Sequence, residues 1–121
     1  QPAAAPTPAM LDLKWSASEK SAAHAAFESA RSRERLAIRR HVEVLLHETI
    51  DGNEIWAIRD YLNDKARELD KKYDFRYSVL ISVFARLLAE GWLTMEDLRD
   101  LDNAKCKLIR EHSAAWARTD A

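Results

Sequence analysis

Apolar residues recur three and four positions apart through most of this chain, which is the period of an α-helix with one buried face. The longest uninterrupted stretch covers residues 16–49, a rod of roughly 50 Å at about 1.5 Å per residue. Its stripe consists of Phe27, Ala30, Glu34, Ile38, Val42, Leu45 and Thr49. Because this rod is longer than a small domain can cover, we expect a second copy of the chain to pack against it. The residues predicted at that dimer interface are Phe27, Ile38, Val42 and Leu45.

Three more helices are predicted beyond a break at Gly52. The second spans residues 54–72, and its predicted buried stripe is Ile55, Ile58, Leu62, Ala66, Leu69 and Tyr73. The third spans about 75–90 and is apolar around most of its circumference, so we expect it to be the central helix of a head. Gly91 ends it, and the last helix runs from 94 to about 118. The stripe of the last helix is Leu98, Leu101, Lys105, Leu108, His112 and Ala115.

Polar residues at the predicted helix starts support these boundaries. Ser16 and Glu19 are three residues apart, as in a capping box where each side chain accepts a hydrogen bond from the other residue's N–H. Thr94 and Asp97 repeat this spacing, with aspartate in place of the usual glutamate. Asp74 is predicted to cap the third helix.

The pattern divides the chain into a leader and one helical domain. Residues 1–13 contain all three prolines and are predicted to be a flexible, disordered leader. Residues 14–118 are predicted to form a single domain, with a long arm helix over 14–50 and the rest of the arm and the head over 53–118. The predicted fold class is therefore all-α, with a long N-terminal helix followed by a three-helix head.

Composition agrees with long helices and removes several other classes. The chain has 121 residues and two glycines, which excludes a turn-rich β protein. Its net charge of −1 gives no field that favours nucleic acid or an anionic membrane. Its longest apolar stretch, residues 79–89, is much shorter than the roughly 20 residues that span a bilayer, so no membrane insertion is expected. The single cysteine, Cys106, excludes an internal disulfide framework and fits a reducing compartment.

No pattern of metal ligands or catalytic groups stands out. The four histidines are His24, His41, His47 and His112. Their spacing matches neither a zincin nor a di-iron bundle, so we interpret them as surface residues. Cys106 lies between Lys105 and Lys107, but residues adjacent in sequence do not face one another on a helix. We therefore expect no catalytic residue, no metal, no cofactor and no enzymatic activity.

A run of arginines lies in the middle of the long helix. Its members are Arg31, Arg33, Arg35, Arg39 and Arg40. Clustered guanidinium groups can bind phosphates or an acidic partner surface. These arginines are spread over several faces and are interspersed with glutamates, which favours a solvated helix with i, i+4 ion pairs.

The second helix carries another line of residues beside its buried stripe. This line, the Trp56 ridge, consists of Trp56, Asp60, Asn63 and Arg67 at positions i, i+4, i+7 and i+11, and Arg59 borders it. A tryptophan beside charged groups is typical of a protein-binding hot spot. The alternative is that Trp56 packs against another helix as a core residue, and the sequence leaves both interpretations open.

Several segments follow one another along residues 15–112. They are WSASE at 15–19, AHAAF at 23–27, WAIRDYL at 56–62, ELDKKYDFRYSV at 68–79 and ISVFARLLAEG at 81–91. In this order and spacing they resemble the fluorescence recovery protein family of cyanobacteria. The resemblance implies an all-α fold in which each chain contributes a long helix to an antiparallel homodimer.

The same resemblance implies a regulator without covalent chemistry. It implies binding to the photoactivated, red form of the orange carotenoid protein, mainly through that protein's C-terminal domain. The family speeds the return of that protein to the orange form and its detachment from the phycobilisome, which ends photoprotective quenching. The implied location is the cytoplasm near the thylakoid. The alternative is a similar dimeric interaction module with a different partner in a non-cyanobacterial host.

The resemblance also implies that Trp56 and Asp60 contact the partner. With the other members of the Trp56 ridge, its neighbour and two lysines of the last helix added, the predicted partner-binding residues are Trp56, Arg59, Asp60, Asn63, Arg67, Lys105 and Lys107. Lys105 and Lys107 fall where the family has a basic head residue. Three positions depart from the family pattern. Arg59 stands where histidine is common, Ala66 stands where an arginine is found, and Trp92 stands where a smaller aliphatic residue is expected.

Overall fold

The computed structural model describes residues 13–48 and 51–120. Its elements are α2 (Ala17–Glu48), α3 (Ile55–Lys72), α4 (Leu80–Glu90), the 3₁₀-helix η1 (Met95–Leu98) and α5 (Asn103–Asp120). No strand occurs within the described ranges, and the predicted all-α fold is confirmed. The predicted leader lies outside the described residues except for its last position, and Thr49 of the predicted arm stripe also lies outside them.

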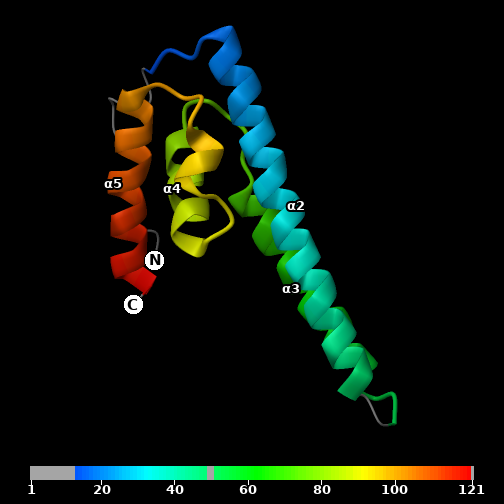
Figure 1. Ribbon diagram of the computed structural model, residues 1–121. Helices are drawn as coiled ribbons and strands as arrows, with labels where there is room; N and C mark the ends of the chain where they lie inside the picture. The colour runs from blue at the N-terminus through cyan, green and yellow to red at the C-terminus, as the bar shows by residue number, and fades with distance from the viewer. Residues whose placement is uncertain (1–12, 49–50, 121) are drawn as a thin grey trace.

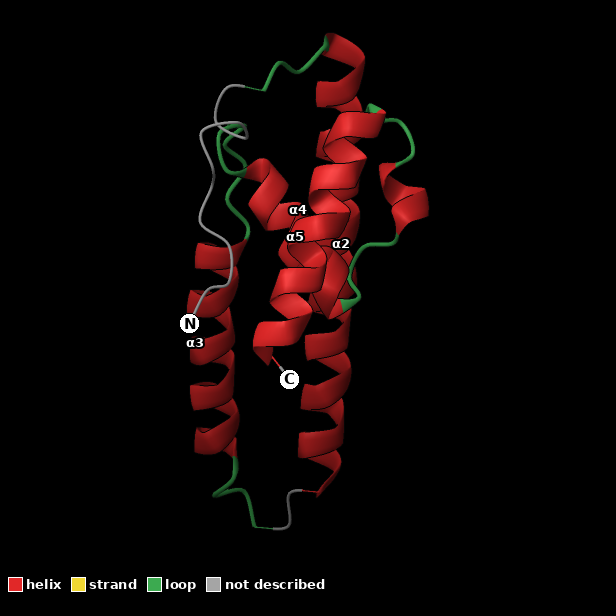
Figure 2. Ribbon diagram, turned by 90° about the vertical axis from the view of Figure 1, so that its left-hand side faces the viewer, coloured by secondary structure: helices red, strands yellow, loops and turns green. Residues whose placement is uncertain are grey.

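The helices form an arm and a head. Figure 1 shows α2 and α3 side by side as an arm that extends past the head, while α4, η1 and α5 lie beside the N-terminal part of α2. The turned view in Figure 2 shows the same pairing of α2 with α3. Six of the eleven residues of α4 are buried, so α4 is the central helix of the head, as its apolar circumference predicts.

The predicted capping box is present at the start of α2. The N–H of Ser16 donates to Glu19 Oε1 and the N–H of Glu19 donates to Ser16 Oγ, both at 3.1 Å. The same carboxylate accepts a bond from the N–H of Asp102 at 3.0 Å and one from Lys105 Nζ at 3.2 Å. Glu19 therefore joins the start of α2 to the start of α5.

The predicted buried stripe of α3 is only partly correct. Ile58 and Tyr73 are buried, but Ile55 is 47% exposed and Leu62 is 41% exposed. The reason is the arm's geometry, since this part of α3 has only α2 beside it and no head helix to cover its remaining faces (Figure 1). The arm consequently presents apolar side chains to solvent, which is costly unless something covers them.

Helix α4 begins at Leu80 instead of near residue 75, so the predicted start was wrong. Asp74 does not cap it, because its carboxylate accepts hydrogen bonds from the Arg76 guanidinium at 2.6–3.0 Å. The segment between α3 and α4 instead turns aromatic rings onto α2 and its N-terminal flank. The ring pairs are Phe27–Phe75, Phe75–Tyr77 and Trp15–Tyr77. This aromatic packing replaces the predicted first turn of the helix.

The last predicted helix is divided in two. The Thr94–Asp97 capping box is present, but it opens only η1. Helix α5 starts at Asn103, with Asp102 Oδ1 accepting a bond from the N–H of Lys105 at 2.8 Å. Gly91 ends α4 with a φ of 88°, a conformation that side chains with a Cβ rarely adopt, as predicted.

A buried ionic cluster joins the arm to the head. Lys72 Nζ at the end of α3 donates to Glu34 Oε2 of α2 and to Glu90 Oε1 of α4, both at 2.7 Å. The Tyr73 hydroxyl donates to the other oxygen of Glu34 at 2.8 Å, and burial, followed by this bond, raises the pKa of Tyr73 far above its usual value. Arg86 Nε donates to Glu90 Oε2 at 2.9 Å. Each buried charge is therefore paired, which a low-dielectric interior requires.

Candidate protein-binding surface

The Trp56 ridge lies exposed along α3. Trp56 is 60% exposed, and Asp60, Asn63 and Arg67 are exposed with it. The sequence left open whether Trp56 is a core or a surface residue, and the structure places its side chain on the surface of the single chain. A large, rigid aromatic ring in this position can supply most of the contact energy of an interface.

Charged neighbours hold the ridge in its present arrangement. The Arg59 guanidinium lies 5.4 Å from the centre of the Trp56 ring and donates to Asp60 Oδ1 at 3.1 Å. Arg67 pairs with Asp64 at 2.6 Å. These ion pairs are more than half exposed and are each worth only about 0–1 kcal/mol, so a partner can replace them at low cost.

The two predicted basic residues of α5 differ in position. Lys107 is exposed, and it stays a candidate for partner binding. Lys105 is 2% exposed, and its Nζ lies 3.1 Å from Asp102 Oδ2 as well as within bonding distance of Glu19. The structure therefore corrects its proposed role, because this ammonium group is used inside the chain and does not reach the surface.

The predicted dimer interface also needs one correction. Phe27 is 3% exposed within a single chain and packs edge-on against Tyr73 and Phe75, so it belongs to the core. Ile38 and Val42 instead line a surface groove with Leu62 of α3, which has a volume of about 400 Å³. We call this feature the arm groove. Leu45 lines a neighbouring hollow with Ala57 and Ile58.

Other apolar residues on the arm were not part of any predicted stripe. Leu36, Val44 and Leu46 of α2 are 44%, 52% and 53% exposed. These three residues are not in the predicted stripe of α2, because that stripe follows a single row of positions along the helix. The described arm therefore exposes large apolar side chains on more than one side of α2, which is costly in water.

The arginine run serves more than one purpose. Arg33 binds both oxygens of Asp97 at 2.8 and 3.1 Å and donates to the carbonyl oxygen of Trp92 at 2.9 Å, which holds η1 against α2. This pairing keeps the pKa of Asp97 far below its usual value, although burial opposes the shift. Arg39 forms the expected i, i+4 pair with Glu43 at 3.5 Å. Arg31 and Arg35 line a pocket between α2 and α3.

The described part of the chain offers little for catalysis. Burial, and next the charge of Asp102, raise the pKa of the Cys106 thiol, and its Sγ donates to the carbonyl oxygen of Leu98 at 3.3 Å. No group of three or more metal-ligating side chains gathers among residues 13–48 and 51–120. Within the same ranges, every helix is too short or too polar to cross a membrane.

Fold and surface together define an all-α protein with an arm, a head and an exposed ridge of aromatic and charged side chains. Residues 15–112 match the family described as photoprotection regulator fluorescence recovery protein. The fluorescence recovery protein of Synechocystis sp. is 39% identical over 99 residues, which are 82% of this chain and 91% of that protein. The chain belongs to the fluorescence recovery protein family, whose members are non-enzymatic regulators of photoprotection.

Solved structures agree with this assignment. The fluorescence recovery protein of Fremyella diplosiphon superposes with a TM-score of 0.77 at 38% identity and covers 84% of this chain and 99% of its own. The Synechocystis sp. protein superposes with a TM-score of 0.78 at 36% identity and has the same coverage. The predictions of the family, of its fold and of a non-enzymatic protein are thus confirmed.

Proposed function

We propose that this protein binds the photoactivated, red form of the orange carotenoid protein and accelerates its return to the orange form. The observation that carries the proposal is the exposed Trp56 ridge, with Trp56 and Asp60 at the positions that match the family pattern. In this proposal the protein also helps to detach its partner from the phycobilisome, which ends fluorescence quenching. It would act in the cytoplasm, near the phycobilisomes.

The mechanism needs binding energy but no covalent step. A regulator that holds one domain of an open partner and also touches the other raises their effective concentration. To accelerate closure, it must bind the closing intermediate more tightly than the open state. To act repeatedly, it must bind the closed form weakly. Weak, exposed ion pairs such as Arg59–Asp60 suit this cycle, because they exchange readily with those of a partner.

We further propose that two copies of the chain pair in an antiparallel dimer through their arms. The arm groove, which is lined by Ile38, Val42 and Leu62, and the exposed Val44 and Leu46 support this assembly. A second arm laid along the first would remove these apolar side chains from water. Such a dimer would also present two copies of the Trp56 ridge.

The test is dark recovery of photoactivated orange carotenoid protein, followed by absorbance, with a sub-stoichiometric amount of this protein. The expected result is faster recovery with the natural chain and slower recovery with the Trp56→Ala or Asp60→Asn variant. Glu68→Gln is the matched control, because it removes one charge from α3 at a position outside the Trp56 ridge. Recovery at the unassisted rate in the presence of the natural chain would refute the proposal.

A second candidate is an interaction module of the same family with a different partner. It is favoured by Arg59 and Ala66, which depart from the family pattern at two positions beside the ridge. Affinity capture from the native host with the natural chain and with Trp56→Ala separates the two candidates. This candidate predicts a captured partner that contains no carotenoid and that is lost with Trp56→Ala.

A further inference from the structure

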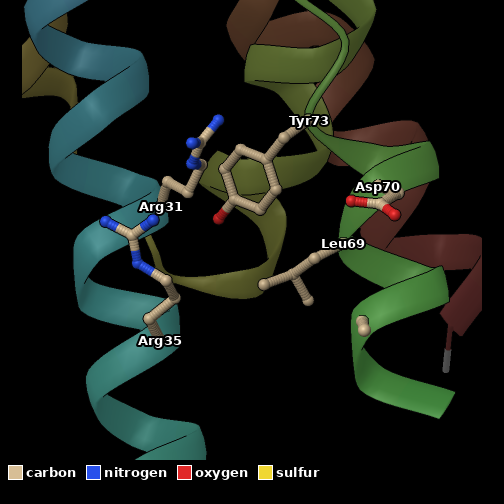
Figure 3. Close-up of a pocket in the computed structure, with 6 residues that line it drawn as sticks. Arg31, Arg35, Leu69, Asp70 and Tyr73 are labelled. Atoms are coloured by element: carbon tan, nitrogen blue, oxygen red, sulfur yellow. The ribbon is translucent and has the colours of Figure 1, made fainter. Parts of the chain in front are cut away.

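A pocket opens between α2 and α3 where the arm meets the head. It has a volume of about 290 Å³ and is lined by Arg31, Arg35, Ala66, Leu69, Asp70 and Tyr73. Figure 3 shows the side chains of Arg31 and Arg35 on the α2 side of the pocket, with Tyr73 and Leu69 facing them from the α3 side. No function described above uses this pocket.

Arg31 and Arg35 differ from most arginines of the described chain, which already face a carboxylate. Those pairs are Arg33–Asp97, Arg39–Glu43, Arg59–Asp60, Arg67–Asp64, Arg76–Asp74, Arg86–Glu90 and Arg99–Glu96. Within residues 13–48 and 51–118, no carboxylate lies within 4.0 Å of the guanidinium nitrogens of Arg31 or Arg35. The guanidinium groups of Arg31 and Arg35 therefore line the same pocket, and neither forms an ion pair with a carboxylate of the described residues.

The nearby acids do not neutralise these two arginines. Glu34 is committed, because one of its oxygens accepts from Lys72 Nζ and the other from the Tyr73 hydroxyl. Asp70 lines the pocket from α3 but forms no ion pair with either arginine. Arg31 is close enough to Tyr73 that its charge opposes the rise in the pKa of that hydroxyl. The side chains that line the pocket therefore carry a net charge of +1, from two arginines and one aspartate.

The geometry suits a single anionic group. Arg31 and Arg35 are four residues apart, so they lie on the same side of α2, and their like charges repel one another at this spacing. A planar guanidinium presents paired N–H donors that match the two oxygens of a carboxylate or phosphate. Leu69 and the Tyr73 ring form the apolar part of the pocket wall on the α3 side. Ala66 leaves the space between the helices open.

We propose that this pocket is a binding site for one oxyanion group, a carboxylate or a phosphate, held between Arg31 and Arg35. The group can belong to a free anion or to an acidic side chain of a protein partner. The position of the pocket suits the second source. Asn63, Ala66 and Asp70 follow one another at i, i+3 and i+7, so the pocket lies on the flank of the Trp56 ridge.

The first measurement is an NMR titration of the natural chain with inorganic phosphate and, separately, with acetate at constant ionic strength. The expected result is saturable shifts in the Arg31 and Arg35 side-chain N–H signals. The Arg31→Gln/Arg35→Gln variant should bind at least about tenfold more weakly. Arg39→Gln/Arg40→Gln is the matched control, because it removes the same charge from the same helix outside the pocket, and it should bind as the natural chain does.

A third variant tests the pocket without removing charge. Ala66→Leu places a larger side chain in the open space and should abolish saturable binding while both arginines remain. The proposal is overturned if neither probe gives saturable shifts with the natural chain. It is also overturned if the Arg31→Gln/Arg35→Gln variant and its control respond alike.

The source of the anion is decided by binding of photoactivated orange carotenoid protein to the same variants. A selective loss with Arg31→Gln/Arg35→Gln, compared with Arg39→Gln/Arg40→Gln, assigns the group to the partner's side chain. An equal effect of both double variants assigns it to a free anion. If the natural chain does not bind the carotenoid protein, the proposed function fails, while the phosphate and acetate titrations still decide the pocket.

Discussion

Lys72 Nζ lies 2.7 Å from Glu34 Oε2, and these two side chains are 2% and 6% exposed. They are separated by 38 residues in sequence and join the end of α3 to the middle of α2. Glu90 of α4 completes the contact, so the position where the arm meets the head is fixed by charge as well as by apolar packing. Removing one member leaves the others charged in a place that water scarcely reaches.

We predict that Lys72→Met destabilises the fold by about 3–5 kcal/mol, because it leaves Glu34 and Glu90 without their shared cation. Urea denaturation followed by circular dichroism measures the loss. Lys71→Met is the control, since that neighbouring lysine is exposed and its loss should stay within about 0.5 kcal/mol. Equal effects of the two variants would show that the buried pair does not stabilise the fold.

Acid should weaken the contact between α2 and η1. The folded-state pKa of Asp97 lies below the ordinary 3.8 because Arg33 binds its carboxylate. This contribution is therefore fully present above about pH 4 and is lost as pH falls through the folded-state pKa. Thermal unfolding measured from pH 7 down to about pH 2.5 should show this loss in the natural chain.

Arg33→Gln provides the comparison for that measurement. It should lower stability at neutral pH and make the acid dependence shallower, because the pKa of Asp97 then approaches its unfolded value. Arg39→Gln removes the same charge from an exposed pair and should keep the slope of the natural chain. An unchanged slope in Arg33→Gln would mean that other carboxylates control the acid transition.

Trp56→Ala should leave the fold nearly intact, with a change in unfolding free energy within about 0.5 kcal/mol, because the ring is mostly exposed. Chemical denaturation gives the value, and far-ultraviolet circular dichroism checks helicity. Phe84→Ala, in which a fully buried ring of α4 is removed, should cost about 3–5 kcal/mol in the same assay. A comparable loss for Trp56→Ala would mark that residue as structural.

Leu45→Glu should convert the proposed dimer to monomers, because it places a charge at an apolar interface. Light scattering coupled to size-exclusion chromatography gives the mass. Leu62→Glu is a second test, since Leu62 is 41% exposed in the single chain and its replacement should leave the monomer folded. Dimers that persist in both variants would place the interface elsewhere.

Local features of this fold could be predicted from the sequence. The α2 start follows from Ser16 and Glu19, and the end of α4 follows from Gly91, because a cap depends on residues only a few positions apart. The apolar period of the long helix and the apolar residues around α4 can likewise be recognised from residues that are close together in the sequence. These features identified an arm and a head.

Long-range contacts account for the errors. The start of α4 is displaced because Phe75 and Tyr77 pack against rings that lie about fifty or more positions earlier in the chain. The family resemblance assigned Lys105 to partner binding, and its buried ion pair with Glu19 could not be predicted because the two residues are 86 positions apart. The exposure of Trp56 could not be decided either, since it depends on whether another helix covers that side of α3.

The side chains of the Trp56 ridge contact residues of their own helix, as in the Arg59–Trp56, Arg59–Asp60 and Arg67–Asp64 pairs, while the core and the buried ionic cluster use other positions. With the ridge binding a partner as proposed, selection for a stable fold and selection for that partner act on largely separate sets of residues. Substitutions such as those at Arg59 and Ala66 can accumulate during evolution without harming the arm or the head. A lineage can in this way change the partner that it recognises and keep the same scaffold.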